Sequence, residues 1–257
     1  MTESFIYVRC TYMRVRPDTW LADLLKAATK VFTAKGYRQA QMSDIAREMG
    51  VSQGTLYNYI ESKEALFQLV CERGFNSTAQ TPQKPPIAPV SFETMVQRIR
   101  EQGSKNARLE ALRAALRTRE PADARAELVG VLREFYSVLE RNRHGFDLVE
   151  RSTSDVPELA QMLFVEGRGR TVDALARYIT SRVETGHFKP VPDAPTAARF
   201  IIEAATWFAR HRHNTPDLQM ISDRDALETT IHFLVSAFIP GDTIETKSPR
   251  KRKRLRK

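Results

Sequence analysis

Residues 43–63 bring together several side chains that can hydrogen-bond to nucleic acid. Gln53 and Asn58 carry amides, which donate and accept at once and so match the edge of an adenine in the DNA major groove. The methyl group of Thr55 can pack against the methyl group of a thymine. This combination predicts that these three residues read bases.

The other polar residues of this stretch are suited to the phosphate backbone of DNA. We expect the hydroxyls of Tyr57 and Tyr59 to bond to phosphates, and Lys63 to add a charge-assisted contact. Ser43 is expected to contact a phosphate too, and Gly54 lets the DNA approach the protein backbone closely. An alternative for the tyrosines is that their rings pack in the core with only the hydroxyl at the surface, and both uses are compatible.

Two short helices joined by a tight turn are expected to position these residues. Ser43 can cap the first helix, and Gly50 suits the left-handed conformation in which a helix ends. Ser52 can cap a second helix over residues 53–60, which carries the base-reading candidates. Helix, tight turn and helix form the helix-turn-helix motif, whose second helix enters the major groove.

At these residues the sequence resembles the TetR/AcrR family of bacterial regulators, whose members are similar to the tetracycline repressor. The match covers about residues 20–75. Met49, Ile60 and Ser43 depart conservatively from the family pattern, and none of them removes a group that would face DNA. The matching residues are Ile45, Ala46, Gly50, Val51, Ser52, Gly54, Thr55, Leu56, Tyr57, Tyr59, Ser62, Lys63, Glu64 and Leu66.

The resemblance implies three partners. These are a palindromic double-stranded DNA operator, a second copy of the chain bound through the last two long helices, and a small-molecule effector that releases a repressor from DNA. The effector is expected in an apolar cavity of the larger domain, to which the sequence itself assigns no residue. Eight residues are apolar or aromatic enough to line such a cavity: Phe135, Tyr136, Phe146, Met162, Phe164, Tyr178, Trp207 and Phe208.

The net charge of +9 is less informative than it first looks. Residues 1–80 contain ten basic and eight acidic side chains, and residues 81–246 contain 22 and 23. The last eleven residues carry eight basic groups and no acidic one. The folded part is therefore close to neutral, and global basicity does not argue for DNA binding by that part.

Composition favours a cytoplasmic, nucleoid-associated protein without a membrane segment. Cys10 and Cys71 cannot form a disulfide framework and do not have zinc-site spacing. No apolar run approaches the roughly 18 residues needed to cross a bilayer. Cys71 falls on the apolar face of an expected helix and is most simply a core residue.

We predict no metal site, no cofactor and no enzymatic activity. Histidines at positions 187, 211, 213 and 232 could suggest a metal site, because imidazole binds zinc and copper. However, His211 and His213 would point to different sides of one helix end, among arginines. The sequence also lacks a nucleophile–base pair, a phosphate-binding glycine loop and paired carboxylates at a meaningful spacing.

Apolar periodicity predicts an all-α protein, with a three-helix helix-turn-helix domain at the N-terminus and a larger helical bundle at the C-terminus. Gly103 and the pair Gly167 and Gly169 are expected to end helices, and Pro121 to lie in the first turn of one. Besides the two short helices, we expect helices at about 20–35, 64–75, 92–103, 109–119, 121–142, 157–167, 172–186, 197–208 and 223–238.

The expected domains follow from composition. Residues 1–17 form an irregular arm, which either reaches a minor groove or is disordered, and residues 18–80 form the DNA-binding domain with its connecting helix. Four prolines in residues 81–90 mark the boundary. Residues 81–240 would bind ligand and dimerise, and residues 241–257 would be a disordered basic tail.

The apolar stripes of the last two helices leave two interpretations open. Each stripe can face its own core, or both can build a two-fold interface. We favour a homodimer, because one helix-turn-helix contacts too few base pairs and because the resemblance implies it. A helical interaction or nucleoid-type protein that binds DNA without an effector remains the alternative function, and an enzyme with an accidental motif is a weaker one.

Overall fold

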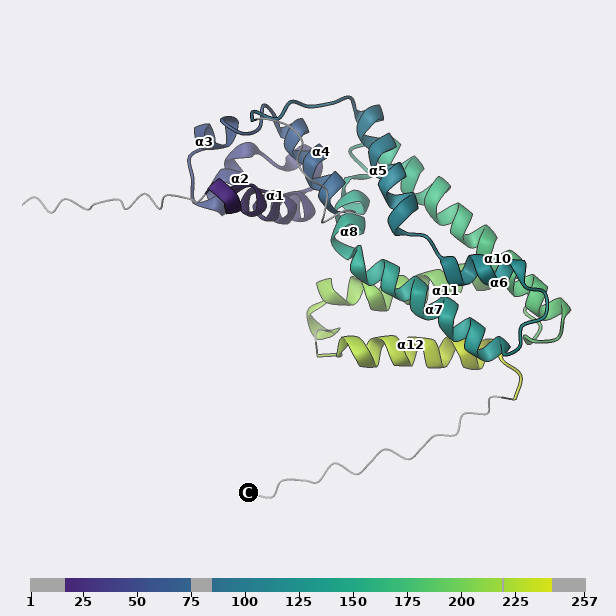
Figure 1. The fold of residues 1–257 in the computed structure, drawn as a ribbon. Helices are drawn as coiled ribbons and strands as arrows, with labels where there is room; N and C mark the ends of the chain where they lie inside the picture. The colour runs from purple at the N-terminus through teal and green to yellow at the C-terminus, as the bar shows by residue number, and fades with distance from the viewer. Residues whose placement is uncertain (1–16, 75–84, 219, 242–257) are drawn as a thin grey trace, which may run out of the picture.

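The structure is a computed structural model that describes residues 17–74, 85–218 and 220–241. These residues form helices, with one isolated bridge between Ile60 and Ile87, which confirms the predicted all-α fold. The helices of residues 17–74 lie at one end of the molecule and those of residues 194–238 at the other (Figure 1). Except for Pro17 and Gly241, the predicted arm and tail lie outside the described residues.

The N-terminal group consists of α1 (Pro17–Gln39), α2 (Met42–Met49), α3 (Gln53–Tyr57) and α4 (Lys63–Gly74). The larger group contains α5 (Phe92–Asn106), α6 (Glu110–Arg117), α7 (Ala124–Arg141), α8 (Arg143–Ser152), α9 (Pro157–Ala160), the π-helical η1 (Gln161–Arg168), α10 (Gly169–Glu184), α11 (Ala194–Ala209), the short 3₁₀ helices η2 (His211–Asn214) and η3 (Pro216–Leu218), and α12 (Asp223–Phe238).

Two hydrophobic cores hold the described residues together. The first joins α1–α4 to Met95 and Ile99 of α5 and to Leu148 and Val149 of α8. The second lies among α6, α7, α10, α11 and α12. Because the first core includes residues beyond 80, the predicted domain boundary there remains a prediction.

Several predicted helix ends were wrong. Gly103 lies inside α5, which continues to Asn106, and Pro121 precedes α7, which begins after its N-cap Asp123. The helix expected to end at Gly167 or Gly169 instead continues from α9 through η1 into α10. Helix α8 was not predicted.

Other local predictions were confirmed. The helices expected at about 20–35 and 172–186 have a glycine near the expected end: Gly36 has φ 77° and interrupts the helical backbone of α1, and Gly186 follows α10 with φ 75°. Helix α12 begins at Asp223, as predicted. Cys71 is fully buried, which raises the pKa of its thiol and agrees with a core role.

A buried arginine anchors the C-terminal end of α6. Arg182 of α10 has no exposed side-chain area, and its guanidinium forms a two-point ion pair with Glu127 at 2.8 and 3.0 Å. It also donates to the carbonyls of Ala115, Thr118 and Arg119. The carbonyls of Ala115 and Thr118 belong to the C-terminal end of α6, where carbonyls have no partner four residues further on, so Arg182 fixes α6 against α7 and α10.

No helix among the described residues is both long enough and apolar enough to cross a lipid bilayer.

Candidate nucleic-acid interface

Helices α2 and α3 form the predicted helix-turn-helix around two fully buried side chains, Ile45 and Leu56. Gly50 follows α2 with φ 68° and ψ 29°, the left-handed conformation expected of it. Its N–H and that of Val51 bond back to carbonyls of α2. The turn therefore has the geometry that the sequence predicts.

The two helix starts differ from each other in how well they were predicted. Ser52 caps α3 as expected and accepts from Thr55 N–H at 3.2 Å. Ser43 does not cap α2, which begins one residue earlier, at Met42. Gln41 is the N-cap, and its N–H donates to the carboxylate of Asp44 at 3.1 Å, because the two form a capping box.

The base-reading candidates lie on the outer side of α3. Gln53, Gly54 and Asn58 are exposed, whereas Leu56 between them is buried. Thr55 is half-buried, and its hydroxyl lies 2.8 Å from that of Ser52. Because the Thr55 hydroxyl has this partner within the protein, the methyl group is the part of Thr55 that is more available for contact with a base. Helix α3 ends at Tyr57, shorter than the predicted 53–60, so Asn58 is its C-cap.

The two tyrosines of this stretch have different surroundings. Tyr57 is 43% exposed and its hydroxyl lies 3.5 Å from the amide nitrogen of Gln53. Tyr59 stacks on Trp20 of α1, with ring centroids 3.6 Å apart. The core-packing alternative thus describes the ring of Tyr59, whereas Tyr57 is placed for an outside contact.

Lys63 has partners within the protein. Its ammonium donates to the carbonyls of Tyr37 and Arg38 at 3.1 and 3.3 Å and lies over the Tyr37 ring, 4.7 Å from the centroid. The Tyr37 hydroxyl in turn donates to Glu64 at 2.8 Å; burial, together with this carboxylate, raises the pKa of Tyr37. Lys63 therefore ties the start of α4 to the end of α1, with at most one ammonium proton left for another acceptor.

Ser43 lies within α2, half-buried, and its hydroxyl donates to the side-chain oxygen of Gln41 at 3.3 Å. Its neighbour Asp44 forms an ion pair with Lys35 of α1 at 2.8 Å, and this contact lowers the pKa of the Asp44 carboxyl. The start of α2 is consequently held to α1 by charge as well as by packing.

Two basic side chains in or next to the helix-turn-helix motif were not among the predicted DNA contacts. Arg38 and Arg47 are each 78% exposed. Residues 17–74 contain seven basic and seven acidic groups, so charge alone would not have singled these two out. Arg47 lies within α2 of the motif and Arg38 at the end of α1, and this position is the signal that sequence reasoning could have used.

Residues 87–90 form hydrogen bonds that support the helix-turn-helix motif. Ile87 N–H donates to the carbonyl of Tyr59 at 2.7 Å, and Glu61 N–H donates to the carbonyl of Ile87. The buried amide of Gln68 bonds to both backbone groups of Val90. These contacts fix the loop between α3 and α4, which positions the recognition helix.

A second candidate site consists of two adjoining cavities in the larger group of helices. One has a volume of about 510 Å³ and lies among α5, α6, η1 and α10, and the other has about 140 Å³ and extends toward α7 and α11. Phe146, Leu163 and Thr171 line both. Of the eight residues suggested from sequence, Phe135, Phe146 and Met162 line a cavity.

The described residues thus form a helical protein with an exposed helix-turn-helix at one end (Figure 1) and two adjoining cavities in the larger group of helices. Residues 24–70 match the family model for bacterial regulatory proteins of the tetR family. The HTH-type regulator YfiR of Bacillus subtilis is 25% identical over 185 residues, which cover 72% of this chain and 76% of YfiR. YvdT, also from Bacillus subtilis, is 43% identical over 49 residues, or 19% of this chain and 25% of YvdT.

A solved structure of AibR, in complex with isovaleryl coenzyme A and operator DNA, shares the fold with a TM-score of 0.50 at 16% identity, over 83% of this chain and 97% of AibR. The curated relatives are transcriptional regulators rather than enzymes. The chain is therefore similar to bacterial transcriptional regulators of the tetR family, most clearly over residues 24–70.

Proposed function

We propose that the chain is a ligand-responsive repressor that binds a palindromic operator as a homodimer. The observation that carries this proposal is the outer side of α3, where Gln53, Tyr57 and Asn58 are exposed on a helix held by Ser52 at its start and by buried Leu56 beneath. A regulator of this kind would act in the cytoplasm, because bacterial DNA lies there.

On the DNA, Gln53, Thr55 and Asn58 would read base edges, and Gly54 would permit close approach. The phosphate contacts would come from Tyr57, Tyr59, Ser43 and Lys63. Phosphate contacts position the protein on the DNA, whereas base contacts determine which sequence it prefers. Mutations in the first set should therefore weaken binding to all sequences, and mutations in the second should change the preferred sequence.

Exposed apolar side chains on α11 and α12 support a homodimer. Phe200 is 67% exposed, Trp207 45% and Phe233 62%, and the two helices that carry them pack against each other. By contrast, the predicted stripe of α12 contains Ile231, Leu234, Val235 and Phe238, which are buried in the chain's own core. The interface we propose is therefore the opposite, outward side, where a second copy would cover large apolar groups.

The two cavities support a partly apolar effector with an anionic group. Their combined lining is dominated by aliphatic and aromatic side chains, and the larger volume falls in the range of small-molecule sites, roughly 300–1,000 Å³. The exposed Arg113 and Arg170 are among the lining residues, and Arg100 is held by Glu166 at 2.8 Å. An acyl coenzyme A, the kind of ligand named for AibR, has both an apolar and a phosphate-rich part.

A contact between α4 and α8 offers a route from the cavities to the DNA. Phe146 of α8 lines both cavities, and its neighbour Gly145 lies directly against Gly74 of α4. Arg210, which also lines a cavity, binds Asp147 and Glu150 of α8 at 2.8 and 2.7 Å. A ligand that moves Phe146 or Arg210 would therefore move α8 and, with it, the end of α4.

Release from DNA by a ligand tests this proposal. The full chain is bound to a duplex selected for tight binding, and acyl coenzyme A thioesters of increasing chain length are titrated in, with anisotropy as the readout. We expect at least one thioester to release the wild type, and Ala174→Phe, which fills the larger cavity, to bind DNA but resist release. Ala126→Phe, on an exposed position of α7, is the control and should be released normally.

Tight binding to a selected site without release by any thioester would reject the acyl coenzyme A effector. Binding to all duplexes alike would favour the nucleoid-type alternative instead.

A further inference from the structure

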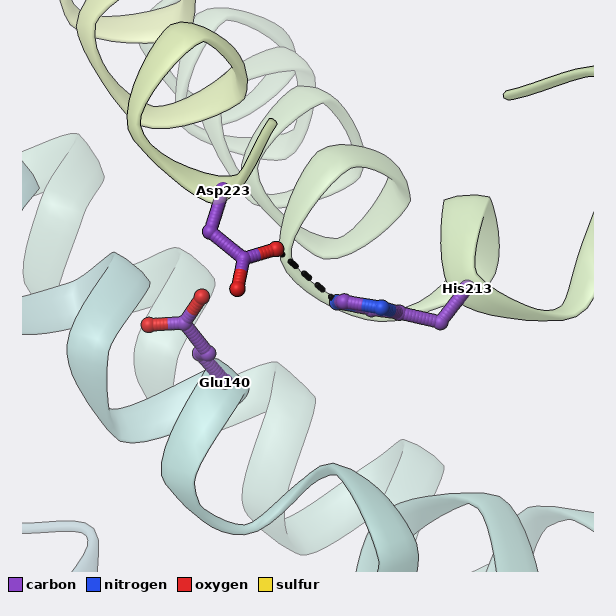
Figure 2. A group of neighbouring side chains, drawn as sticks. All are labelled: Glu140, His213 and Asp223. Atoms are coloured by element: carbon purple, nitrogen blue, oxygen red, sulfur yellow. Dashed lines mark ion pairs between the residues drawn. The ribbon is translucent and has the colours of Figure 1, made fainter. Parts of the chain in front are cut away.

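Three side chains with metal-binding groups meet where α7, η2 and α12 come together (Figure 2). Glu140 comes from the last turn of α7, His213 from η2, and Asp223 is the first residue of α12. One ligand atom from each lies within 4.8 Å of the others. The three elements are far apart in sequence, so the fold alone creates this group.

The imidazole of His213 has an unused ring nitrogen at this point. Its Nε2 is buried and has no hydrogen-bond partner among the described residues, and the nearest oxygen of Asp223 in its ion pair is 3.9 Å away. A buried polar atom without a partner is costly and needs an explanation. Arg212, Arg143, Asp223 and Glu140 all place their charges near this imidazole.

The two carboxylates complete a ligand set. In Figure 2 the oxygens of Glu140 and Asp223 point toward each other across the space in front of His213. Arg212 also binds Asp223, through one carboxylate oxygen. This oxygen, Oδ1, is also the one that lies 3.9 Å from His213 Nε2, so a cation would either share Oδ1 with Arg212 or bind the other oxygen, Oδ2.

We propose that Glu140, His213 and Asp223 form a site for one divalent transition-metal ion, with zinc as the reference ion. One imidazole and two carboxylates are a ligand set that zinc accepts, with water in the fourth position. Zinc bonds of about 2.0–2.2 Å require the three side chains to draw closer together than they are here. Arg212 and Arg143 oppose a cation, so we expect a Kd in the micromolar range.

The site would act on the helices that carry the exposed apolar residues. It links the end of α7 to the segment that follows α11 and to the start of α12. A bound ion would therefore restrain α11 and α12 relative to each other. This role is independent of the DNA-binding and effector proposals.

Zinc binding by the full chain tests the site. Protein stripped of metal with a chelator is titrated with Zn²⁺ in competition with a chromophoric chelator, and Co²⁺ is then used to record d–d absorption. We expect one site per chain that His213→Ala and Glu140→Gln each weaken by at least about tenfold. His232→Ala is the control, because His232 is an exposed histidine of α12 away from the group, and it should bind as the wild type does.

Equal zinc affinity in the wild type and in both variants would overturn the proposal, and so would the absence of binding at 100 micromolar zinc, a concentration about tenfold above the expected range. Melting curves without metal show whether each variant is folded. If His213→Ala is not, Glu140→Gln decides the question by itself, because glutamine keeps the shape of the side chain and removes its charge.

Discussion

At the scale of single residues, Lys63 has two roles that must be separated. It is a predicted phosphate contact, yet its ammonium is bonded to two carbonyls at the end of α1. A cation at the C-terminal end of a helix stabilises that helix. Loss of Lys63 should therefore affect both the stability of the domain and its affinity for DNA.

We expect Lys63→Ala to weaken binding to every duplex and to reduce the slope of log K against log salt concentration by about one. It should also lower the free energy of unfolding by about 1 kcal/mol. Asn58→Ala should instead change which operator is preferred, because its amide is predicted to contact bases. Anisotropy at several salt concentrations checks both, with Lys105→Ala, an exposed lysine of α5, as the control.

If Lys63→Ala and Asn58→Ala lose the same affinity on all duplexes, this division between phosphate and base contacts is wrong.

Loss of the buried Arg182 side chain should strongly destabilise the protein. Arg182→Ala leaves Glu127 and three carbonyls without their buried partner, so we expect the free energy of unfolding to fall by about 3–5 kcal/mol. Arg133→Ala is the matched control: Arg133 pairs with Glu228 at 2.7 Å, but both are about half exposed, and the loss should be at most about 1 kcal/mol. Urea unfolding of both variants measures the difference, and equal losses would contradict it.

At the scale of elements, the sequence was most informative where a local rule decides the structure. Gly50 and Ser52 were predicted correctly, because a left-handed helix end and a helix cap depend on neighbouring residues. Ser43 was not, because Gln41 and Asp44 form a capping box that competes for the same helix start.

Helix α8 was missed for a different reason. It begins directly after the expected end of a helix at about residue 142. Gly145 lies inside it, and the missing side chain of Gly145 is explained by Gly74, about 70 positions earlier in the chain. A Cβ at Gly145 would lie 2.5 Å from the carbonyl oxygen of Gly74. A contact so distant in sequence leaves no local pattern, and the same holds for the two cavities and for the group around His213.

The contact between α4 and α8 makes a prediction at this scale. Gly145→Ala must push α4 and α8 apart, since the opposing atoms are backbone, and overpacking of this kind costs about 1–3 kcal/mol. We also expect it to change DNA affinity, because α4 begins at the motif. Gly130→Ala in α7 is the control: a Cβ there meets nothing within 4 Å, and alanine should stabilise the helix by up to about 1 kcal/mol.

Thermal melts and DNA titrations of both glycine variants check this. Unchanged stability and affinity in Gly145→Ala would show that α4 and α8 are not tightly coupled.

At the scale of the whole molecule, we expect two copies of the chain to bind DNA together. Residues 17–74 carry no net charge and α3 has only five residues, so one domain offers few specific contacts. Two domains related by a two-fold axis would double these contacts and require a palindromic site. We expect the exposed side chains of Phe200, Trp207 and Phe233 to form the interface between the two copies.

We expect Phe200→Asp to produce a monomer that binds a full operator at least about tenfold more weakly, because a charge would then be buried in an apolar interface. Sedimentation and DNA titration measure the two effects together. Val165→Asp, at an exposed apolar position of η1, is the control and should stay dimeric. A wild type that is monomeric at the concentrations where it binds DNA would contradict the dimer.

Selection of binding sites from random duplexes by the full chain measures whether it reads a palindromic operator. We expect enrichment of one inverted repeat, with half-site centres about 10 base pairs or a multiple apart, and a changed half-site sequence for Asn58→Ala. Recovery of random sequences, or of a site without two-fold symmetry that Asn58→Ala selects equally, would contradict it.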